Sequence, residues 1–229
     1  MAGSGRESDS AMTTLPGGPA PLPAEIPIFP LQDALLLPGG RLPLNIFEPR
    51  YLAMVEDALG AGRLLGMVLP DPALPRVAGR SGIYRTGCLG RIASFSETGD
   101  GRYLITLLGL LRYDVLEELP DHPAGYRRVR ADFTPYEADL EPPEAEPDRT
   151  ALLAALWPYF ATRHIEVDRA AIERIPPLDL VTTLSMICPF EGREKQALLL
   201  APDPRQRAEL LTALLRIGAA SSDAPGRPI

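Results

Sequence analysis

The spacing of the apolar residues changes near Pro147, and this change constrains the fold more than any other feature of the sequence. Before Pro147 the apolar residues come in short runs separated by Gly, Pro and Asp, which is typical of strands and turns. After it they recur at helical spacing. We therefore predict an α+β protein, with a β-rich subdomain over residues 25–136 and a helical subdomain over residues 150–217.

Three further segments are polar and rich in proline. Residues 137–148 carry acids and prolines without a basic residue, so residues 137–149 are predicted to form a solvated acidic linker. Residues 1–24 and 218–229 are predicted to be disordered tails, because small polar residues bury too little apolar surface to offset the entropy of ordering. The N-terminus lacks the features of a signal peptide and no apolar run is long enough for a bilayer, so we expect a cytoplasmic protein outside any membrane.

The β-rich half is expected to form a curled antiparallel sheet with one early helix. Two short runs in residues 26–40 contain Pro27, Pro30 and Pro38, which favours edge strands. A strand closed by a proline is expected over residues 63–70, and a half-buried strand over residues 127–133. The helix is predicted to start at Pro49, with an apolar stripe formed by Tyr51, Leu52, Val55, Ala58 and Leu59.

A hairpin is predicted around residues 98–101, whose sequence Thr-Gly-Asp-Gly suits a tight turn. Residues 104–108 are apolar at almost every position, which suits a central strand. Gly109 interrupts this run, and we expect a bulge or bend there. A bulge conformation with a positive φ angle would require glycine, whereas plain extended strand would not.

Five helices are predicted in the second half. Shorter helices are expected over residues 168–175 and 191–200. The three others are indicated by apolar stripes: Leu152, Leu153, Leu156, Trp157 and Phe160; then Leu178, Val181, Leu184 and Ile187; then Leu210, Leu211, Leu214 and Leu215.

Catalytic motifs are missing from the sequence. Lys195 is the single lysine and lacks the glycine-rich lead of a P-loop, and its setting is that of an ordinary helix face rather than of a Ser-Lys hydrolase. Cys88 and Cys188 lie among apolar residues without zinc spacing, so we expect small buried side chains. His122 is interpreted as a turn residue, and His164 as a helix C-terminal cap. We therefore expect no enzyme activity, no metal and no cofactor.

The charge balance argues against nucleic acid as a partner. The chain has 23 basic and 30 acidic residues, a net charge of −7, which disfavours phosphate backbones over most of the surface. The basic cluster Arg127, Arg128 and Arg130 is the feature that could contact RNA. Alternatively, it is a solvated strand face or is paired with acids of the nearby linker.

Four segments together resemble the Lon-type substrate-binding domain, the N-terminal module of ATP-dependent Lon proteases. The most specific pieces are Phe47-Glu48-Pro49-Arg50-Tyr51, and Pro189-Phe190 followed by Glu194-Lys195-Gln196. Leu200 departs from the family pattern, in which an acid is common. The resemblance covers residues 26–217, and its segments are IPIFPLQDALLLPGGRLPLNIFEPRYLAMVEDAL, GCLGRIASF, GLLRYDVLEEL and CPFEGREKQALLLAPDPRQRAELLTALL.

The resemblance implies a PUA-like pseudo-barrel followed by a helical bundle, and a standalone member without the ATPase and protease modules. It implies recognition of polypeptide clients, or of a protease or chaperone partner, without catalysis. RNA binding on the PUA-like fold is the alternative.

Four residues at the start of the predicted helix are the candidate binding residues. Phe47, Glu48, Arg50 and Tyr51 combine aromatic rings with both charge signs, which suits polypeptide contacts. The competing interpretation is structural: Phe47 staples the helix start, Glu48 acts on the helix dipole and Tyr51 faces the core.

Overall fold

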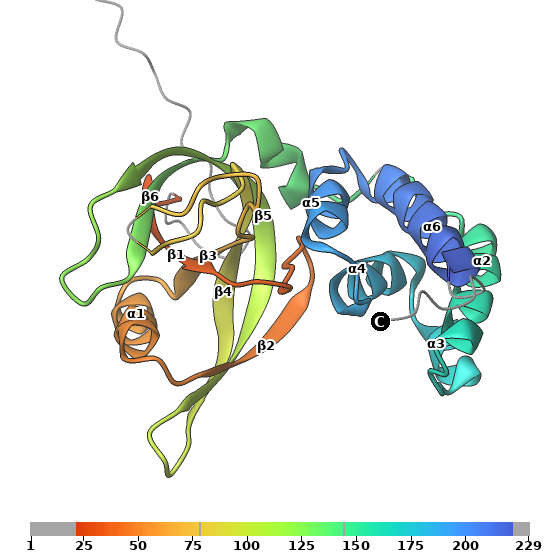
Figure 1. Ribbon diagram of the computed structural model, residues 1–229, viewed down its shortest axis with the longest axis horizontal. Helices are drawn as coiled ribbons and strands as arrows, with labels where there is room; N and C mark the ends of the chain where they lie inside the picture. The colour runs from red at the N-terminus through yellow and green to blue at the C-terminus, as the bar shows by residue number, and fades with distance from the viewer. Residues whose placement is uncertain (1–21, 78, 144, 222–229) are drawn as a thin grey trace, which may run out of the picture.

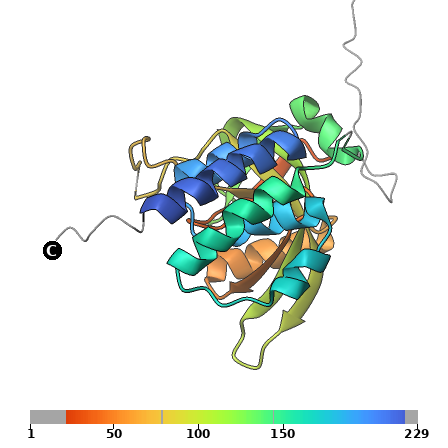
Figure 2. The same cartoon turned by 90° about the vertical axis from the view of Figure 1, so that its right-hand side faces the viewer.

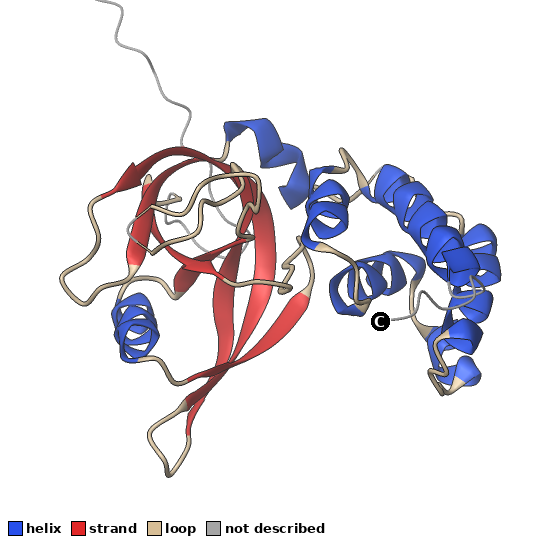
Figure 3. Ribbon diagram, viewed as in Figure 1, coloured by secondary structure: helices blue, strands red, loops and turns tan. Residues whose placement is uncertain are grey.

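A computed structural model describes residues 22–77, 79–143 and 145–221, and it consists of a barrel and a helical part (Figures 1 and 3). The α+β prediction is confirmed. The strands are β1 (Glu25–Pro30), β2 (Arg41–Ile46), β3 (Leu64–Val68), β4 (Thr86–Glu97), β5 (Tyr103–Leu119) and β6 (Arg127–Asp132). The helices are α1 (Pro49–Gly60), η1 (Thr134–Leu140), α2 (Arg149–Thr162), α3 (Arg169–Arg174), α4 (Pro177–Ile187), α5 (Gly192–Leu200) and α6 (Pro204–Ser221).

The strands form one sheet in the order β2-β5-β4-β3-β1-β6, and an additional β5–β6 pairing closes it into a barrel. Its pairs are antiparallel except β1–β3, which is parallel. The predicted hairpin joins β4 to β5 and projects away from the barrel at the bottom of Figure 1. Helix α1 lies on the side of the barrel opposite the helical part (Figure 1).

The prediction that β1 is an edge strand is wrong, because β1 pairs with both β3 and β6. Its prolines are tolerated because each lies where one neighbour is missing. Pro27 is in register with β6 but precedes the first β3 pair, while Pro30 pairs with β3 beyond the last β6 pair.

The second apolar run of this region is a buried loop rather than a strand. Leu35, Leu36 and Leu37 are 2%, 1% and 0% exposed, although their backbone pairs with no strand. Two glycines make room for the loop: a Cβ at Gly90 would lie 2.8 Å from Leu36, and one at Gly109 would lie 2.0 Å from the carbonyl oxygen of Leu37. The close approach of the loop to β4 and β5 therefore explains why both positions are glycine. The spacing of apolar residues in the sequence does not predict this contact.

A bulge does lie beside Gly109, because the β4–β5 register shifts between Leu89 and Gly90. Of the two backbone conformations left open for Gly109, the one with positive φ is not adopted, since the described glycines with positive φ lie elsewhere. The expected central position of residues 104–108 holds, with β2 on one side and β4 on the other. Leu104 is nevertheless 46% exposed, so this strand is apolar but not buried on both faces.

The helices predicted from the second half are all present, and they pack in front of the barrel in Figure 2. Ile187 departs from its predicted stripe and is exposed, because α4 buries Leu180, Val181 and Leu184 and ends at Ile187. The predicted C-terminal tail starts too early: α6 continues to Ser221, and Gly218 lies against the ring of Tyr159.

The predicted linker and tails also differ in part from the structure. η1 extends to Leu140, and the carboxylate of Asp139 in it is paired with a buried arginine, so the start of the linker is not solvated. Leu22 packs partly buried against the barrel core. The remainder of both predicted tails, residues 1–21 and 222–229, lies outside the described residues.

Candidate binding surface and domain junction

Residue Phe47 lies on the surface directly before α1. Glu48 has extended backbone angles at the N-cap position and Pro49 follows at the first helical position, where its missing N–H costs nothing. The turn into the helix leaves the Phe47 side chain outside, and this residue is 61% exposed. The predicted hydrophobic staple is therefore not formed.

Two charged residues, Glu48 and Arg50, follow Phe47 in the chain. The Arg50 guanidinium donates to the Glu48 carboxylate at 2.8 Å, and both side chains are about half exposed. The same guanidinium lies 4.5 Å from the ring centre of Tyr51. Tyr51 itself is 7% exposed and packs on Phe29 at 4.2 Å between ring centres, so it belongs to the core, as the structural interpretation expects.

The β4–β5 hairpin adds three residues that the sequence did not single out. Arg102 lies 5.9 Å from the ring centre of Phe47, and the rings of Tyr103 and Phe95 are 5.0 Å apart in an edge-on arrangement. The Tyr103 hydroxyl donates to Glu56 of α1 at 2.6 Å, which joins the hairpin to the helix. This hydrogen bond raises the pKa of Tyr103 to about 12.

We call these residues the hairpin–α1 surface: Phe47, Glu48, Arg50, Phe95, Arg102 and Tyr103. The surface combines aromatic rings with arginines and carboxylates. Aromatic and arginine side chains contribute most of the binding energy at many protein interfaces. Of the four predicted binding residues, Phe47 is exposed, Glu48 and Arg50 are about half exposed, and Tyr51 is buried.

A second feature is the junction between the barrel and the helices, where Arg112 of β5 is buried. Its guanidinium holds the Asp139 carboxylate through two nitrogens at 2.8 and 2.7 Å. It also donates to the carbonyls of Leu199, Ala201 and Pro202 at 3.2, 2.8 and 3.1 Å. The last carbonyl groups of a helix have no N–H partner within the helix, and Arg112 supplies donors for those at the C-terminal end of α5.

Two side chains of α5 attach the helix to the barrel. Lys195 is buried and donates to the backbone carbonyl of Asp33, so the expectation that it lies on an ordinary helix face is wrong. Gln196 donates to the carbonyl of Thr86 in β4 at 3.1 Å. The preceding Glu194 forms a capping box with Glu191 at the start of α5. The Glu194-Lys195-Gln196 motif therefore forms and docks this helix.

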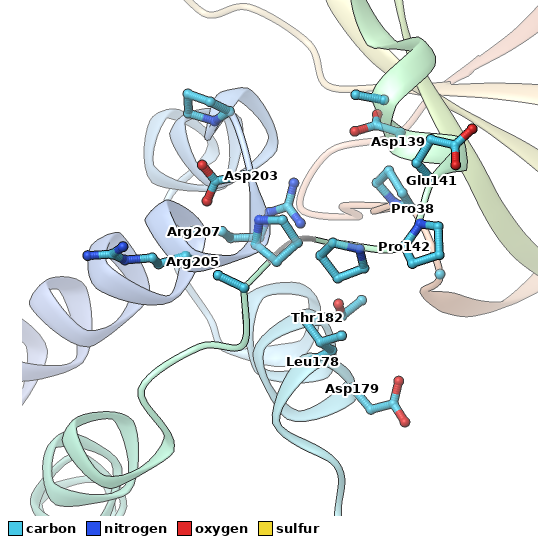
Figure 4. A pocket seen from close by; sticks show the side chains of 16 residues that line it. Pro38, Asp139, Glu141, Pro142, Leu178, Asp179, Thr182, Asp203, Arg205 and Arg207 are labelled. Atoms are coloured by element: carbon cyan, nitrogen blue, oxygen red, sulfur yellow. The ribbon is translucent and has the colours of Figure 1, made fainter.

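A pocket of about 580 Å³ opens at the same junction, between η1 and the following segment, α4 and the start of α6 (Figure 4). Its lining includes prolines, acids and Arg207. The Arg207 side chain extends from α6 toward the other lining residues, whereas Arg205 points away from them (Figure 4).

The basic cluster on β6 is paired with acids. Arg127 pairs with Glu118, Arg128 with Glu25 and Arg130 with Glu117, at 2.7, 3.9 and 3.2 Å. The partners come from β5 and β1 rather than from the linker. These ion pairs offset the positive charge that an RNA site would require.

The cysteines and histidines have structural surroundings. Cys88 and Cys188 are buried and free, and burial raises the pKa of both thiols, that of Cys188 to about 11. His122 stacks on Tyr126 in the turn before β6. His164 follows α2 with a φ of 53°, and its backbone N–H bonds to Ala161, so it ends the helix through its backbone.

Neither a metal cluster nor a membrane span occurs in the parts of the chain that the structure describes. No group of three His, Cys, Asp or Glu residues there could hold a metal ion. None of the helices in those parts is long and apolar enough to cross a bilayer.

Comparison with known proteins gives consistent matches. Residues 25–216 match the family described as the ATP-dependent protease La (LON) substrate-binding domain. Lon protease 2 of Myxococcus xanthus is 26% identical over 224 residues, which cover 92% of this chain and 26% of that protein. Lon protease 2 of Sorangium cellulosum is 31% identical over 121 residues, or 51% of this chain and 14% of that protein. The chain thus spans about a quarter or less of these relatives.

Solved structures agree with the family match. A Lon N-terminal domain protein from Xanthomonas campestris has a TM-score of 0.56 at 26% identity, covering 82% of this chain and 97% of that one. The N-terminal domain of a Mycobacterium avium complex Lon protease has a TM-score of 0.54 at 19% identity, covering 83% and 97%, and supports the fold alone.

Proposed function

The chain belongs to the Lon substrate-binding domain family, and we propose that it recognises polypeptides in protein quality control without itself catalysing a reaction. Its partners would be unfolded client proteins, or a protease or chaperone that receives them. The proposal places this activity in the cytoplasm, where free thiols such as Cys88 and Cys188 stay reduced.

The hairpin–α1 surface is the observation that supports the proposal. Unfolded polypeptides offer apolar and charged side chains in varied order, so a surface for them needs rings and charges of both signs close together. Phe47 supplies an aromatic side chain that is 61% exposed, and Arg102 lies against its ring. Glu48 and Arg50, which follow Phe47 closely in the chain, are both about half exposed.

Binding of a permanently unfolded probe, such as a reduced and carboxymethylated protein carrying a fluorophore, tests the proposal. We expect Phe47→Ala to weaken binding by about tenfold, because truncating a central aromatic side chain at an interface costs on the order of 1–2 kcal/mol. We expect Arg50→Ala to weaken it less, because this arginine is half exposed and already paired.

Ile187→Ala is the matched control, since Ile187 is 66% exposed but lies at the end of α4 in the helical part. All three variants should keep the wild-type melting temperature. If Phe47→Ala and Ile187→Ala bind the probe equally well, the hairpin–α1 surface is not the recognition surface. Peptide cleavage or ATP hydrolysis by the purified chain would contradict the non-catalytic role.

A further inference from the structure

We propose that the junction pocket binds the C-terminal carboxylate of a client polypeptide through Arg207. The inference deepens the proposed function and rests on it for the identity of the ligand. Arg207 is buried beside this pocket, yet it uses few of its hydrogen-bond donors.

Arg207 lies in the first turns of α6 and is 3% exposed. Its Nε donates to the carbonyl of Leu198 at 2.9 Å. Its other guanidinium nitrogens make no hydrogen bond to a residue within the described ranges. Arg112, the neighbouring buried arginine, instead bonds through all three of its guanidinium nitrogens. A guanidinium carries five N–H donors, so Arg207 keeps several for a ligand.

The charge of Arg207 is also incompletely compensated. No carboxylate in the described part of the chain lies within ion-pair distance of it. Asp139, which faces it, is held by Arg112, and Asp203 accepts from the backbone and side-chain nitrogens of Gln206. Burial and the nearby charge of Arg112 lower the pKa of Arg207 to about 10, and the attraction of Asp139 and Asp203 offsets these two effects only in part. A buried charge without its own counterion is costly, and a bound anion would offset that cost.

The pocket favours a monovalent, planar anion attached to an apolar group. Besides Asp139 and Asp203, its lining includes the carboxylates of Glu141 and Asp179, which repel any anion and repel a doubly charged phosphate more strongly than a singly charged carboxylate. A guanidinium fork matches a carboxylate through two parallel hydrogen bonds. The remaining lining contains Leu178 and several prolines, and about 580 Å³ is enough for more than a free ion. A chain terminus combines a carboxylate with the apolar side chain of the last residue.

A pair of fluorescent peptides, identical except for a free or an amidated C-terminus and ending in leucine, tests the inference. We expect the wild-type protein to bind the free acid at least tenfold more tightly than the amide. Arg207→Gln should abolish this difference. Arg205→Gln is the matched control, because Arg205 lies on the same helix but is exposed and points out of the pocket (Figure 4), and it should keep the preference.

A second variant covers the case in which Arg207→Gln does not fold. Leu178→Trp leaves Arg207 in place and fills the pocket, so it should weaken binding of the free acid at least tenfold. Equal binding of acid and amide to the wild-type protein overturns the inference. If acid and amide bind equally but binding of the unfolded probe still depends on Phe47, the carboxylate site is excluded and the proposed function is retained. A preference for the acid without binding of the unfolded probe would instead contradict the proposed function and retain the carboxylate site.

Discussion

At Gly109 the backbone of the adjacent loop leaves no room for a side chain. The carbonyl oxygen of Gly109 accepts from the N–H of Gly39 at 2.9 Å, and its own N–H donates to Gly40 at 2.8 Å. These bonds press β5 against the loop before β2, so that a Cβ on residue 109 would lie 2.0 Å from the oxygen of Leu37. The strand and the loop could not both keep their positions around a larger residue.

We expect Gly109→Ala to destabilise the protein by about 1–3 kcal/mol, the usual cost of forcing an extra carbon into a packed site. Denaturant unfolding measures the change. Gly60→Ala is the control, because Gly60 ends α1 without a positive φ, and a Cβ added there would meet nothing within 4 Å. This variant should be neutral or stabilising by up to about 1 kcal/mol. Equal stability of the two variants would show that the loop moves aside easily.

The candidate binding residues differ in how far the sequence could predict their positions. Phe47, Glu48 and Arg50 adjoin a well-marked helix start, but the sequence left open whether Phe47 packs against the helix or lies on the surface. The burial of Arg207 also has a signal in the sequence, because this residue lies four positions before Leu211 and eight before Leu215, on the buried stripe of α6. The approach of Arg102 and Phe95 to α1 depends on the length and curl of the hairpin, which residue spacing does not give.

At the scale of elements, α5 connects the two parts of the molecule. The helix is nine residues long, too short to be stable alone in water. Lys195 and Gln196 bond to the barrel from its middle, and Arg112 bonds from the barrel to the carbonyls at its end. The docked helix therefore depends on side chains that occupy buried positions.

Arg112→Met should destabilise the protein by about 3–5 kcal/mol, because it leaves the mostly buried Asp139 carboxylate without a counterion. Arg85→Met is the comparison: Arg85 pairs with Asp114 at 3.2 Å, but its side chain is 72% exposed, so we expect a loss below about 1 kcal/mol. Urea unfolding of both variants provides the measurement. Similar losses would mean that the Arg112 network contributes no more than a surface ion pair.

The elements themselves were predictable wherever a local pattern was strong. Helix α1, the β4–β5 hairpin and the helices of the second half follow from caps, turn residues and apolar stripes. The interior position of β1 was not predictable, because prolines normally mark edges and the second neighbour of β1 is β6, which lies far along the chain. The strand predicted at Leu35 to Leu37 was wrong because a buried loop and a buried strand have the same composition.

At the scale of the whole molecule, the barrel and the helices share a core. One cluster of buried side chains contains Leu36, Met67 and Leu107 from the barrel side together with Leu156 and Leu211 from the helices. A second cluster, around Leu89 and Tyr113, fills the barrel. The change of periodicity near Pro147 therefore separates two kinds of secondary structure but does not separate two cores.

A shared core predicts that the two parts unfold together. Trp157, the single tryptophan, lies in α2 with the Arg169 guanidinium 4.8 Å from its ring centre, so its fluorescence reports on the helices. Hydrogen exchange of backbone amides in β4 and β5 reports on the barrel. We expect one urea midpoint from both probes, because exposing the helical side of the core also exposes Leu36 and Leu107. Arg112→Met removes the bonds that hold the end of α5 and should shift both midpoints together. A tryptophan transition at lower urea than the loss of strand protection would show instead that the helices unfold from a barrel that is stable by itself.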